Sequence, residues 1–255
     1  MPRIIYTVAE WRAERSGHRV AGRTVGFVPT MGALHRGHGS LFERARQECD
    51  VVLASVFVNP TQFDEAHDFQ KYPRTLEADC RLMAAAGVDV VFAPRVAEMY
   101  PNGTDYTVQE SAMSRELCGA HRPGHFTGVL TVVMKLLQIA EADRAYFGEK
   151  DFQQLQLVRG MCEAFFVRTT IVGCPTVREA DGLAMSSRNA RLSPAERALA
   201  PRFYEILCQA PTAEIARAEL GAAGFAVDYV EDRDGRRFGA VRLGLTRLID
   251  NVARV

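Results

Sequence analysis

The most informative segment of the chain is a glycine-punctuated turn with two histidines, His35-Arg-Gly37-His38-Gly39, between a β-branched run and a helical pattern. Such a turn exposes unpaired N–H groups and the positive end of a helix dipole, which favour phosphate. It is not a dinucleotide fingerprint, because Phe42 replaces the third glycine, nor a Walker loop, because His38 and Gly39 replace lysine and serine or threonine. Two histidines three residues apart can hydrogen-bond a polyphosphate from one helix face. The alternatives are a capped helix with surface histidines, or two of three metal ligands.

Four further polar segments are candidates for ligand binding. Asn59-Pro-Thr-Gln62 follows a buried run, and its alternative is a simple proline turn. Lys150-Asp151 offers a cation for phosphate and an acceptor for ribose hydroxyls, unless Asp151 is only an N-cap. Arg122-Pro-Gly-His125 precedes an apolar helix that it could merely initiate, and Ser186-Ser-Arg188 could be a second phosphate clamp or an ordinary loop. Five such elements in one chain favour a shared ligand site.

Lysine is rare in this sequence. Of the 31 basic residues, only Lys71, Lys135 and Lys150 are lysines, so arginine serves wherever a generic positive charge is sufficient. A lysine retained at a predicted strand-to-helix junction, as at Lys150, is therefore a candidate for a specific role.

Short β-branched or aromatic runs alternate with helical patterns over the first two thirds of the chain. The predicted strands are 24–29, 50–58, 88–94, 144–149 and 167–174, and the predicted helices are 39–48, 75–86, 126–140 and 153–165. This alternation predicts an α/β fold, with a doubly wound parallel sheet, helices on both faces, and ligands beyond the carboxyl ends of the strands.

After Pro175 the pattern becomes that of a smaller α+β domain. Ser193-Pro194 combines a good N-cap with a good first helical residue. A further helix is predicted at 212–223, and strands at 226–231 and 237–245 flank an Asp-Arg-Asp-Gly turn at 232–235. We therefore predict two domains, 1–175 and 176–255.

The composition excludes several classes of partner. The 255 residues carry 31 basic and 31 acidic side chains, so no basic surface for nucleic acid or an anionic membrane is expected. The longest uncharged stretch, 51–63, is shorter than the roughly 20 apolar residues of a membrane span and contains a proline. Charges near the N-terminus do not fit a signal peptide, and six cysteines without a C-x-x-C pair favour buried free thiols. We expect a cytoplasmic protein.

Six motifs occur in order over residues 24–192: PTMGALHRGHGSL, FVNPTQF, YPR, RPGHFTGV, FGEKDFQQ and READGLAMSSRN. In this combination the chain resembles the pantothenate synthetase (pantoate–beta-alanine ligase) family. The outer two motifs resemble the HxGH and KMSKS-type signatures of the nucleotidylyl-transferase superfamily. The chain departs from the family pattern at Arg191, where an aromatic residue is usual, and after Cys208, where it is shortened.

The resemblance implies a Rossmann-like domain that binds ATP and pantoate, followed by a small domain with the KMSKS-like loop at its start. It implies condensation of (R)-pantoate with beta-alanine through a pantoyl-adenylate, with release of AMP and pyrophosphate, in coenzyme A biosynthesis. ATP with Mg²⁺ is expected as substrate, and no protein ligand of the Mg²⁺ can be named from the sequence. No tightly bound organic cofactor is expected. A homodimer is also implied.

The resemblance also implies roles for individual residues. His35 and His38 would hold the ATP phosphates, while Lys150, Ser186, Ser187 and Arg188 would balance charge on the phosphorus centre. Further ATP-binding residues would be Pro29, Thr30, Met31, Gly37, Gly148, Asp151, Val177 and Met185. Gln62 and Gln154, with Asn59, would hold pantoate. Tyr72, Arg122 and His125 would be pocket or gate residues.

Two alternatives stay open from the sequence. A sister nucleotidylyltransferase would share the HxGH element but would transfer a nucleotide without requiring pantoate. A catalytically silent nucleotide- or RNA-binding module related to synthetases is the other alternative, although the neutral charge argues against RNA.

Overall fold

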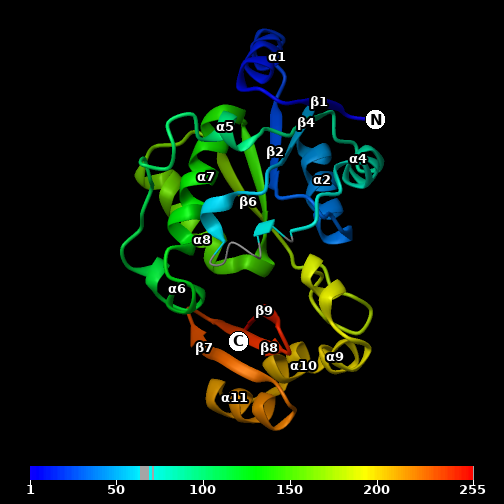
Figure 1. The fold of residues 1–255 in the computed structure, drawn as a ribbon, viewed down its shortest axis with the longest axis vertical. Helices are drawn as coiled ribbons and strands as arrows, with labels where there is room; N and C mark the ends of the chain where they lie inside the picture. The colour runs from blue at the N-terminus through cyan, green and yellow to red at the C-terminus, as the bar shows by residue number, and fades with distance from the viewer. Residues whose placement is uncertain (64–68, 71, 255) are drawn as a thin grey trace. The chain divides into compact units, whose positions relative to one another are not determined.

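A computed structural model of the protein describes residues 1–63, 69–70 and 72–254. It divides into two compact units (Figure 1). The first comprises Met1–Gly148 and Gln153–Cys174, and the second comprises Glu149–Phe152 and Pro175–Val255. The short piece Glu149–Phe152 therefore groups with the C-terminal part of the chain.

The first unit is built on a six-stranded sheet in which all pairings are parallel. Its strands are β1 (Arg3–Ile5), β2 (Val25–Thr30), β3 (Val51–Val56), β4 (Val90–Phe92), β5 (Arg144–Gly148) and β6 (Thr170–Cys174). The spatial order is β1-β4-β3-β2-β5-β6, so the winding reverses between β2 and β5. Ligands of doubly wound sheets bind at such a reversal, beyond the carboxyl ends of the strands.

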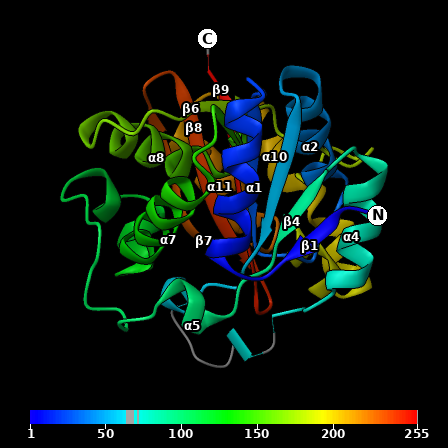
Figure 2. The same ribbon diagram turned by 90° about the horizontal axis from the view of Figure 1, so that it is seen from above.

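Helices cover both faces of this sheet. They are α1 (Val8–Val20), α2 (Arg36–Glu48), α4 (Leu76–Ala85), α5 (Val96–Met99), α6 (Cys118–His121), α7 (His125–Ala140) and α8 (Phe152–Ala164). Figure 2 shows α2 and α4 on one side of the strands and α7 and α8 on the other. Phe42 of α2 and Met83 of α4 pack on Val28 and Val52 of the sheet in one buried cluster. Strands buried on both faces explain the nearly continuous apolar runs in the sequence.

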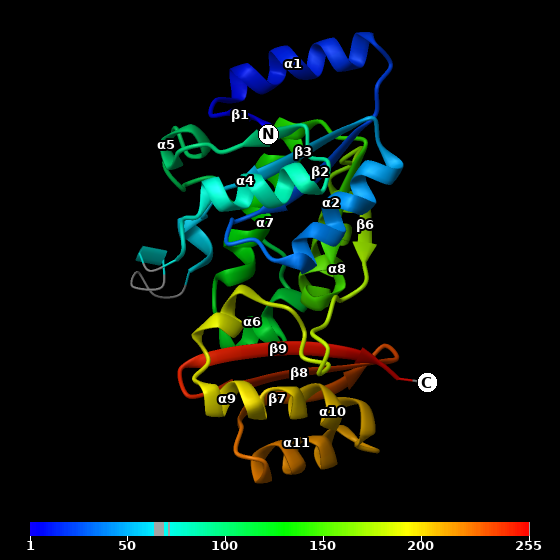
Figure 3. The same cartoon turned by 90° about the vertical axis from the view of Figure 1, so that its right-hand side faces the viewer.

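The second unit pairs a three-stranded antiparallel sheet with helices. Its elements are a 3-10 turn η4 (Ser187–Arg191), helices α9 (Pro194–Leu199), α10 (Pro201–Gln209) and α11 (Ala213–Ala222), and strands β7 (Ala226–Arg233), β8 (Arg236–Leu243) and β9 (Thr246–Ala253). Figure 3 shows these helices on one side of the β7-β8-β9 sheet. Phe203, Leu207 and Leu220 of the helices form a core with Val241 and Leu248 of the strands.

The predicted fold class is confirmed, and the structure corrects several details of the predicted elements. The turn at 232–235 is smaller than predicted. The β-ladder continues to the pair Arg233–Arg236, and within 232–235 only Asp234 and Gly235 have positive φ. The helix predicted from Ser193 is interrupted before Pro201, which begins α10. Strands β1 and β9 and helices α1, α5 and α6 were not predicted.

Five of the six cysteines are buried free thiols, as predicted, but Cys208 is exposed. In the part of the chain that the structure describes, no helix has both the length and the apolar run needed to cross a membrane.

Candidate active site

A buried carboxylate fixes the conformation of the loop from β2 to α2. Gly32 and Ala33 have positive φ values of 81° and 52°, which are unfavourable for a residue with a side chain such as alanine. Asp79 of α4, only 3% exposed, accepts hydrogen bonds from the N–H groups of Ala33 (3.1 Å) and Leu34 (2.9 Å). These bonds offset the strain and fix the direction from which the chain enters α2.

The two histidines of this loop form a reciprocal cap at the start of α2. His35 is the N-cap residue, and its Nδ1 accepts a hydrogen bond from the Gly37 N–H (3.1 Å). The His38 Nδ1 accepts one from the His35 N–H (3.3 Å), and the ring centroids lie 4.2 Å apart. Because each Nδ1 is an acceptor, each neutral ring carries its proton on Nε2. Capping thus sets the tautomer that can donate from Nε2 to a phosphate oxygen.

Pro29 and Thr30 end β2, next to β5, which ends at Gly148. The Thr30 hydroxyl donates to the Ser55 carbonyl (2.6 Å) and accepts from the Gly32 N–H (3.2 Å). This side chain is therefore engaged in ordering the β2–α2 loop.

Asn59 organises the turn that carries Gln62. Asn59, 1% exposed, caps the 3-10 turn η1 (Pro60–Gln62), and its Oδ1 accepts from the Thr61 N–H (3.3 Å) and the Tyr100 hydroxyl (2.7 Å). Burial raises the pKa of Tyr100 above its ordinary value, which further favours the protonated hydroxyl that donates this bond. Asn59 Nδ2 donates to Gln62 Oε1 (3.0 Å) and to the Gly128 carbonyl (3.2 Å). Both amide ends of Asn59 are thus engaged within the protein.

Arg122 and His125 converge on the backbone of the same turn. The Gln62 carbonyl accepts from Arg122 Nη2 (3.2 Å) and lies 2.9 Å from His125 Nδ1, which must therefore be the protonated nitrogen. His125 Nε2 lies 3.0 Å from Arg122 Nη1 and is the acceptor. Helix α7 reaches this turn because Gly128 has no side chain: a Cβ there would lie 2.2 Å from the Thr61 carbonyl oxygen. The structure thus joins two separate sequence motifs, RPGHFTGV and FVNPTQF, at Gln62.

The side chain of Gln62 also contacts Met31, since its Nε2 lies 3.2 Å from Met31 Sδ. Tyr72 lies farther along, with its ring edge-on to Phe63 at 5.7 Å between centroids. Gln154 follows Gln153 in α8 and is half-buried. Gln153, which the sequence did not single out, is buried and holds the Cys118 N–H and the Glu116 carbonyl.

In the second unit, Lys150 lies in a 3-10 turn, η3 (Glu149–Asp151). Its side chain is 16% exposed, and Nζ lies 3.9 Å from Asp151 Oδ2. The carbonyls of Glu149 and Lys150 both accept hydrogen bonds of 2.9 Å from Asn251 Nδ2. The Lys150 turn is therefore fixed by strand β9.

The segment with Val177, Met185 and the two serines also lies in the second unit. The Met185 N–H donates to the Val177 carbonyl (3.0 Å), and Arg178 forms a β-bridge with Ala184, so this segment is a short hairpin. It ends in η4, which begins at Ser187 and whose N-cap is Ser186, with Oγ accepting from the Arg188 N–H (3.2 Å). The structure therefore places the hydroxyls and guanidinium of the predicted clamp on one 3-10 turn.

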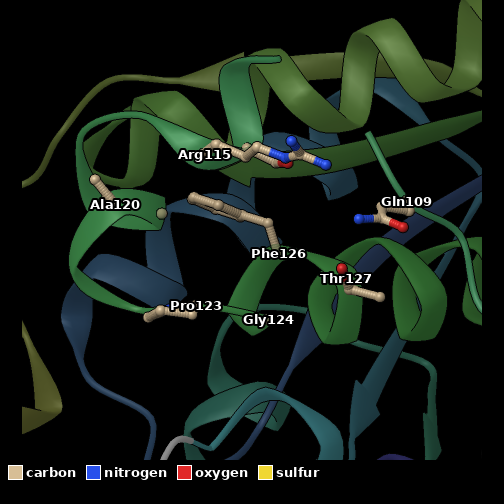
Figure 4. A pocket seen from close by; sticks show the side chains of 9 residues that line it. Gln109, Arg115, Ala120, Pro123, Gly124, Phe126 and Thr127 are labelled. Carbon is tan, nitrogen blue, oxygen red and sulfur yellow. The ribbon is translucent and has the colours of Figure 1, made fainter. Parts of the chain in front are cut away.

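The candidate residues described above form no metal cluster and do not line the cavity shown in Figure 4. Among the described residues, no group of three or more His, Cys, Asp or Glu side chains is arranged to hold a metal ion. A cavity of about 380 Å³ is lined by side chains that include Arg115 and Phe126 (Figure 4). Its lining does not include any residue predicted for ATP or pantoate, although Pro123 and Gly124 lie between Arg122 and His125 in the sequence.

Known proteins resemble this chain over its whole length. A family model described as pantoate-beta-alanine ligase matches residues 3–253. The pantothenate synthetase of Bdellovibrio bacteriovorus is 54% identical over 242 residues, which cover 95% of this chain and 94% of that protein. The pantothenate synthetase of Cereibacter sphaeroides (strain ATCC 17029) is 50% identical over 278 residues, with 99% of each chain covered.

Solved structures of pantothenate synthetases also superpose closely on this chain. The pantothenate synthetase of Thermus thermophilus superposes with a TM-score of 0.90 at 45% identity, covering 98% of this chain and 99% of the other. The pantoate-beta-alanine ligase of Francisella tularensis, complexed with beta-gamma ATP and beta-alanine, has a TM-score of 0.94 at 40% identity, covering 99% and 98%. The chain therefore belongs to the pantoate-beta-alanine ligase family and is a ligase that joins pantoate to beta-alanine with the use of ATP.

Proposed function

We propose that the ligation proceeds in two half-reactions. In the first, the pantoate carboxylate attacks the α-phosphorus of ATP, and the electron pair of the broken bond leaves with pyrophosphate. In the second, the amine of beta-alanine attacks the carbonyl carbon of pantoyl-adenylate and AMP leaves, which gives pantothenate for coenzyme A biosynthesis. A free carboxylate is a poor electrophile, and the mixed anhydride with AMP supplies the leaving group that an amine requires.

The observation that carries this proposal is the reciprocal cap of His35 and His38. With both Nδ1 atoms accepting backbone N–H groups, the two neutral rings donate from Nε2. Donors fixed in advance stabilise charge that develops on the departing phosphates without reorganising. We assign Gly37 to the same phosphates, because the start of a helix favours anions.

The charge on the attacked phosphorus is assigned to residues of the second unit. Lys150 supplies a compact ammonium, while Ser186, Ser187 and Arg188 supply hydroxyl and guanidinium donors from one turn. We further assign Asp151 to the ribose hydroxyls. The remaining contacts to the nucleotide are assigned to Pro29, Thr30, Met31, Gly148, Val177 and Met185.

Pantoate is assigned to Gln62 and Gln154, whose neutral amides orient a carboxylate and hydroxyls without an ion pair that would weaken the attacking oxygen. For Asn59 we propose an indirect role. Since its amide is engaged with Gln62, Tyr100 and Gly128, we propose that it orients Gln62. Arg122 and His125 hold the backbone of the same residue, and Tyr72 is assigned to the pocket or its gate.

Mg²⁺ is proposed to enter with ATP, held by phosphate oxygens and water, as this cation commonly is at nucleotide sites. That arrangement needs no tightly bound organic cofactor and no cluster of protein ligands. We also propose that the protein is a cytoplasmic homodimer. Sedimentation velocity measures the oligomeric state directly.

The experiment that tests the two-step route is exchange of labelled pyrophosphate into ATP. Exchange should require pantoate and Mg²⁺ but not beta-alanine, because adenylation is complete before the amine reacts. Exchange that demands beta-alanine would overturn the separate half-reactions. Exchange that is independent of pantoate would instead indicate a nucleotidylyltransferase with another acceptor.

A further inference from the structure

Strand β9 of the second unit contacts both 3-10 turns that carry proposed phosphate residues, η3 and η4. Two adjacent residues of this strand, Asp250 and Asn251, are each 4% exposed. Buried polar side chains cost stability unless they are hydrogen-bonded, so their partners indicate what they hold in place.

Asn251 uses its whole side chain to hold the Lys150 turn. Both hydrogens of Nδ2 are donated, one to the Glu149 carbonyl and one to the Lys150 carbonyl, at 2.9 Å each. Its Oδ1 accepts from Arg236 Nη1, and the Arg236 guanidinium lies 4.0 Å from the ring centroid of Phe152. Hydrogen bonds to two successive carbonyls therefore fix the turn, and Arg236 packs on Phe152, the residue that follows it.

The neighbouring Asp250 holds the other segment. Its carboxylate takes a bidentate pair from Arg178 at 2.6 and 3.0 Å. Arg178 also donates to the Gly182 carbonyl and stacks on Tyr204 at 3.6 Å, so it closes the hairpin that leads to Ser186. One strand thus fixes both the lysine turn and the hairpin before the serine turn.

We propose that Asn251 is a positioning residue for adenylation, which sets the backbone of the η3 turn and through it the place of the Lys150 ammonium. This inference rests on the proposed role of Lys150. Asn251 does not need to touch substrate. Because it fixes two carbonyls of the turn, the backbone of Lys150 cannot move, and the ammonium can change place only by rotation about the bonds of its own side chain. Misplacement of a catalytic group by about 1 Å can lower a rate by about 100-fold.

The test is a double-mutant cycle on pantoate-dependent pyrophosphate exchange. Asn251→Leu removes both donors at similar volume, and Asn251→Asp keeps the acceptor for Arg236 while it replaces the donating nitrogen with oxygen. Both should lower the maximal exchange rate by about 10- to 100-fold and leave the KM for pantoate within about threefold of wild type. In a Lys150→Ala background, Asn251→Leu should lower the rate by less than about threefold more, because the group it positions is gone.

A control separates positioning from loss of stability. Asp232→Asn breaks a different ion pair of the same sheet, with the buried Arg237, which lies away from η3 and η4 in the hydrogen-bond network. Rates are compared at a temperature where circular dichroism shows all variants folded, and Asp232→Asn should keep the wild-type rate there.

The outcomes distinguish the two ideas. A Lys150→Ala enzyme with near-normal exchange removes the proposed role of Lys150 and this inference with it. A slow Lys150→Ala enzyme, with Asn251 variants at the wild-type rate or with fully additive effects, contradicts only the positioning role. If one Asn251 variant does not fold, the other decides.

Discussion

His35 serves two purposes that one substitution can separate. It caps α2 through Nδ1, and we propose that it donates to phosphate through Nε2. Asparagine is among the best N-cap residues but has no group in the place of Nε2. His35→Asn should therefore keep the free energy of unfolding within about 0.5 kcal/mol and slow adenylation by about 10²- to 10³-fold.

Pyrophosphate exchange and urea unfolding measure the two quantities for His35→Asn side by side. A variant with normal exchange and normal stability would show that the histidine is only a cap. Loss of exchange in parallel with loss of folded protein would show that asparagine does not replace the cap.

Lys150→Arg tests whether the position needs more than a positive charge. An ammonium is a compact point charge, whereas a guanidinium is a broad planar fork that needs more space. In a turn held at both neighbouring carbonyls, the backbone cannot shift to accommodate the larger group. We expect adenylation to slow by about 10²-fold or more, close to the effect of Lys150→Ala and equal to about 3 kcal/mol of transition-state stabilisation.

Single-turnover formation of pantoyl-adenylate measures that step directly for Lys150→Arg. ATP binding should weaken much less than the rate, because a positive charge remains. A rate within a few-fold of wild type would remove Lys150 from the catalytic assignment.

The candidate residues could be proposed from sequence because their motifs occur in order, but the contacts that hold them could not be predicted. Nothing near Asp79 signals that it holds the N–H groups of Ala33 and Leu34, which lie more than 40 positions earlier. Asn251 lies 101 positions from Lys150. Polar residues that act through long-range hydrogen bonds carry no local pattern, and sequence analysis therefore missed both.

At the scale of elements, the approach of α7 to the η1 turn depends on one glycine. A Cβ at Gly128 would lie 2.2 Å from the Thr61 carbonyl oxygen, so Gly128→Ala must displace the turn that carries Gln62. We expect a loss of about 1 to 3 kcal/mol in the free energy of unfolding. We also expect a KM for pantoate raised by about tenfold, with a much smaller change in the KM for ATP.

Gly160→Ala is the matched control for Gly128→Ala. Gly160 lies in α8 with nothing within 4 Å of an added Cβ, and alanine there should stabilise the helix by up to about 1 kcal/mol. Steady-state kinetics with each substrate varied give the comparison. Equal changes in both KM values for Gly128→Ala would contradict the placement of Gln62 at pantoate.

Elements with strong hydrophobic patterns were predicted well, and those without were not. Strand β3 is a run of buried β-branched and apolar residues, and α7 is a long apolar helix between a loop and a polar end. In β9, the buried polar residues Asp250 and Asn251 interrupt the apolar pattern. They can be buried because Arg178 and Arg236, which lie elsewhere in the chain, donate hydrogen bonds to them. Long-range contacts thus stabilise this strand, and its own hydrophobic periodicity does not predict it.

At the scale of the whole molecule, the proposed ATP residues are divided between two compact units. His35 and His38 belong to the first unit, whereas Lys150 and the Ser186–Arg188 turn belong to the second. If these assignments are right, adenylation requires a folded second unit. Within it, Arg237 is fully buried and pairs with Asp232 through two hydrogen bonds of 2.7 and 2.8 Å.

Asp232→Asn should lower the free energy of unfolding at pH 7 by about 1 to 2 kcal/mol. Loss of a charged hydrogen-bond partner for a buried guanidinium costs stability, but Asp232 itself is 42% exposed, and solvent screening reduces the effect. Asp234→Asn is the control: it makes the same change at the exposed turn, where asparagine tolerates the positive φ, and should cost less than about 0.5 kcal/mol.

The difference in unfolding free energy between wild type and Asp232→Asn should depend on pH, and this dependence identifies its cause. Hydrogen bonds from Arg237 hold the pKa of Asp232 below its ordinary value, so the folded state binds this proton less readily than the unfolded state does. The stabilisation is complete above about pH 5 and is lost as the pH falls below about 4 and approaches the folded-state pKa. Urea titrations between pH 3 and 7 should therefore show the unfolding free energies of wild type and Asp232→Asn converging in acid. A difference that stays constant over this range would mean that asparagine perturbs packing and that the ionised carboxylate contributes nothing.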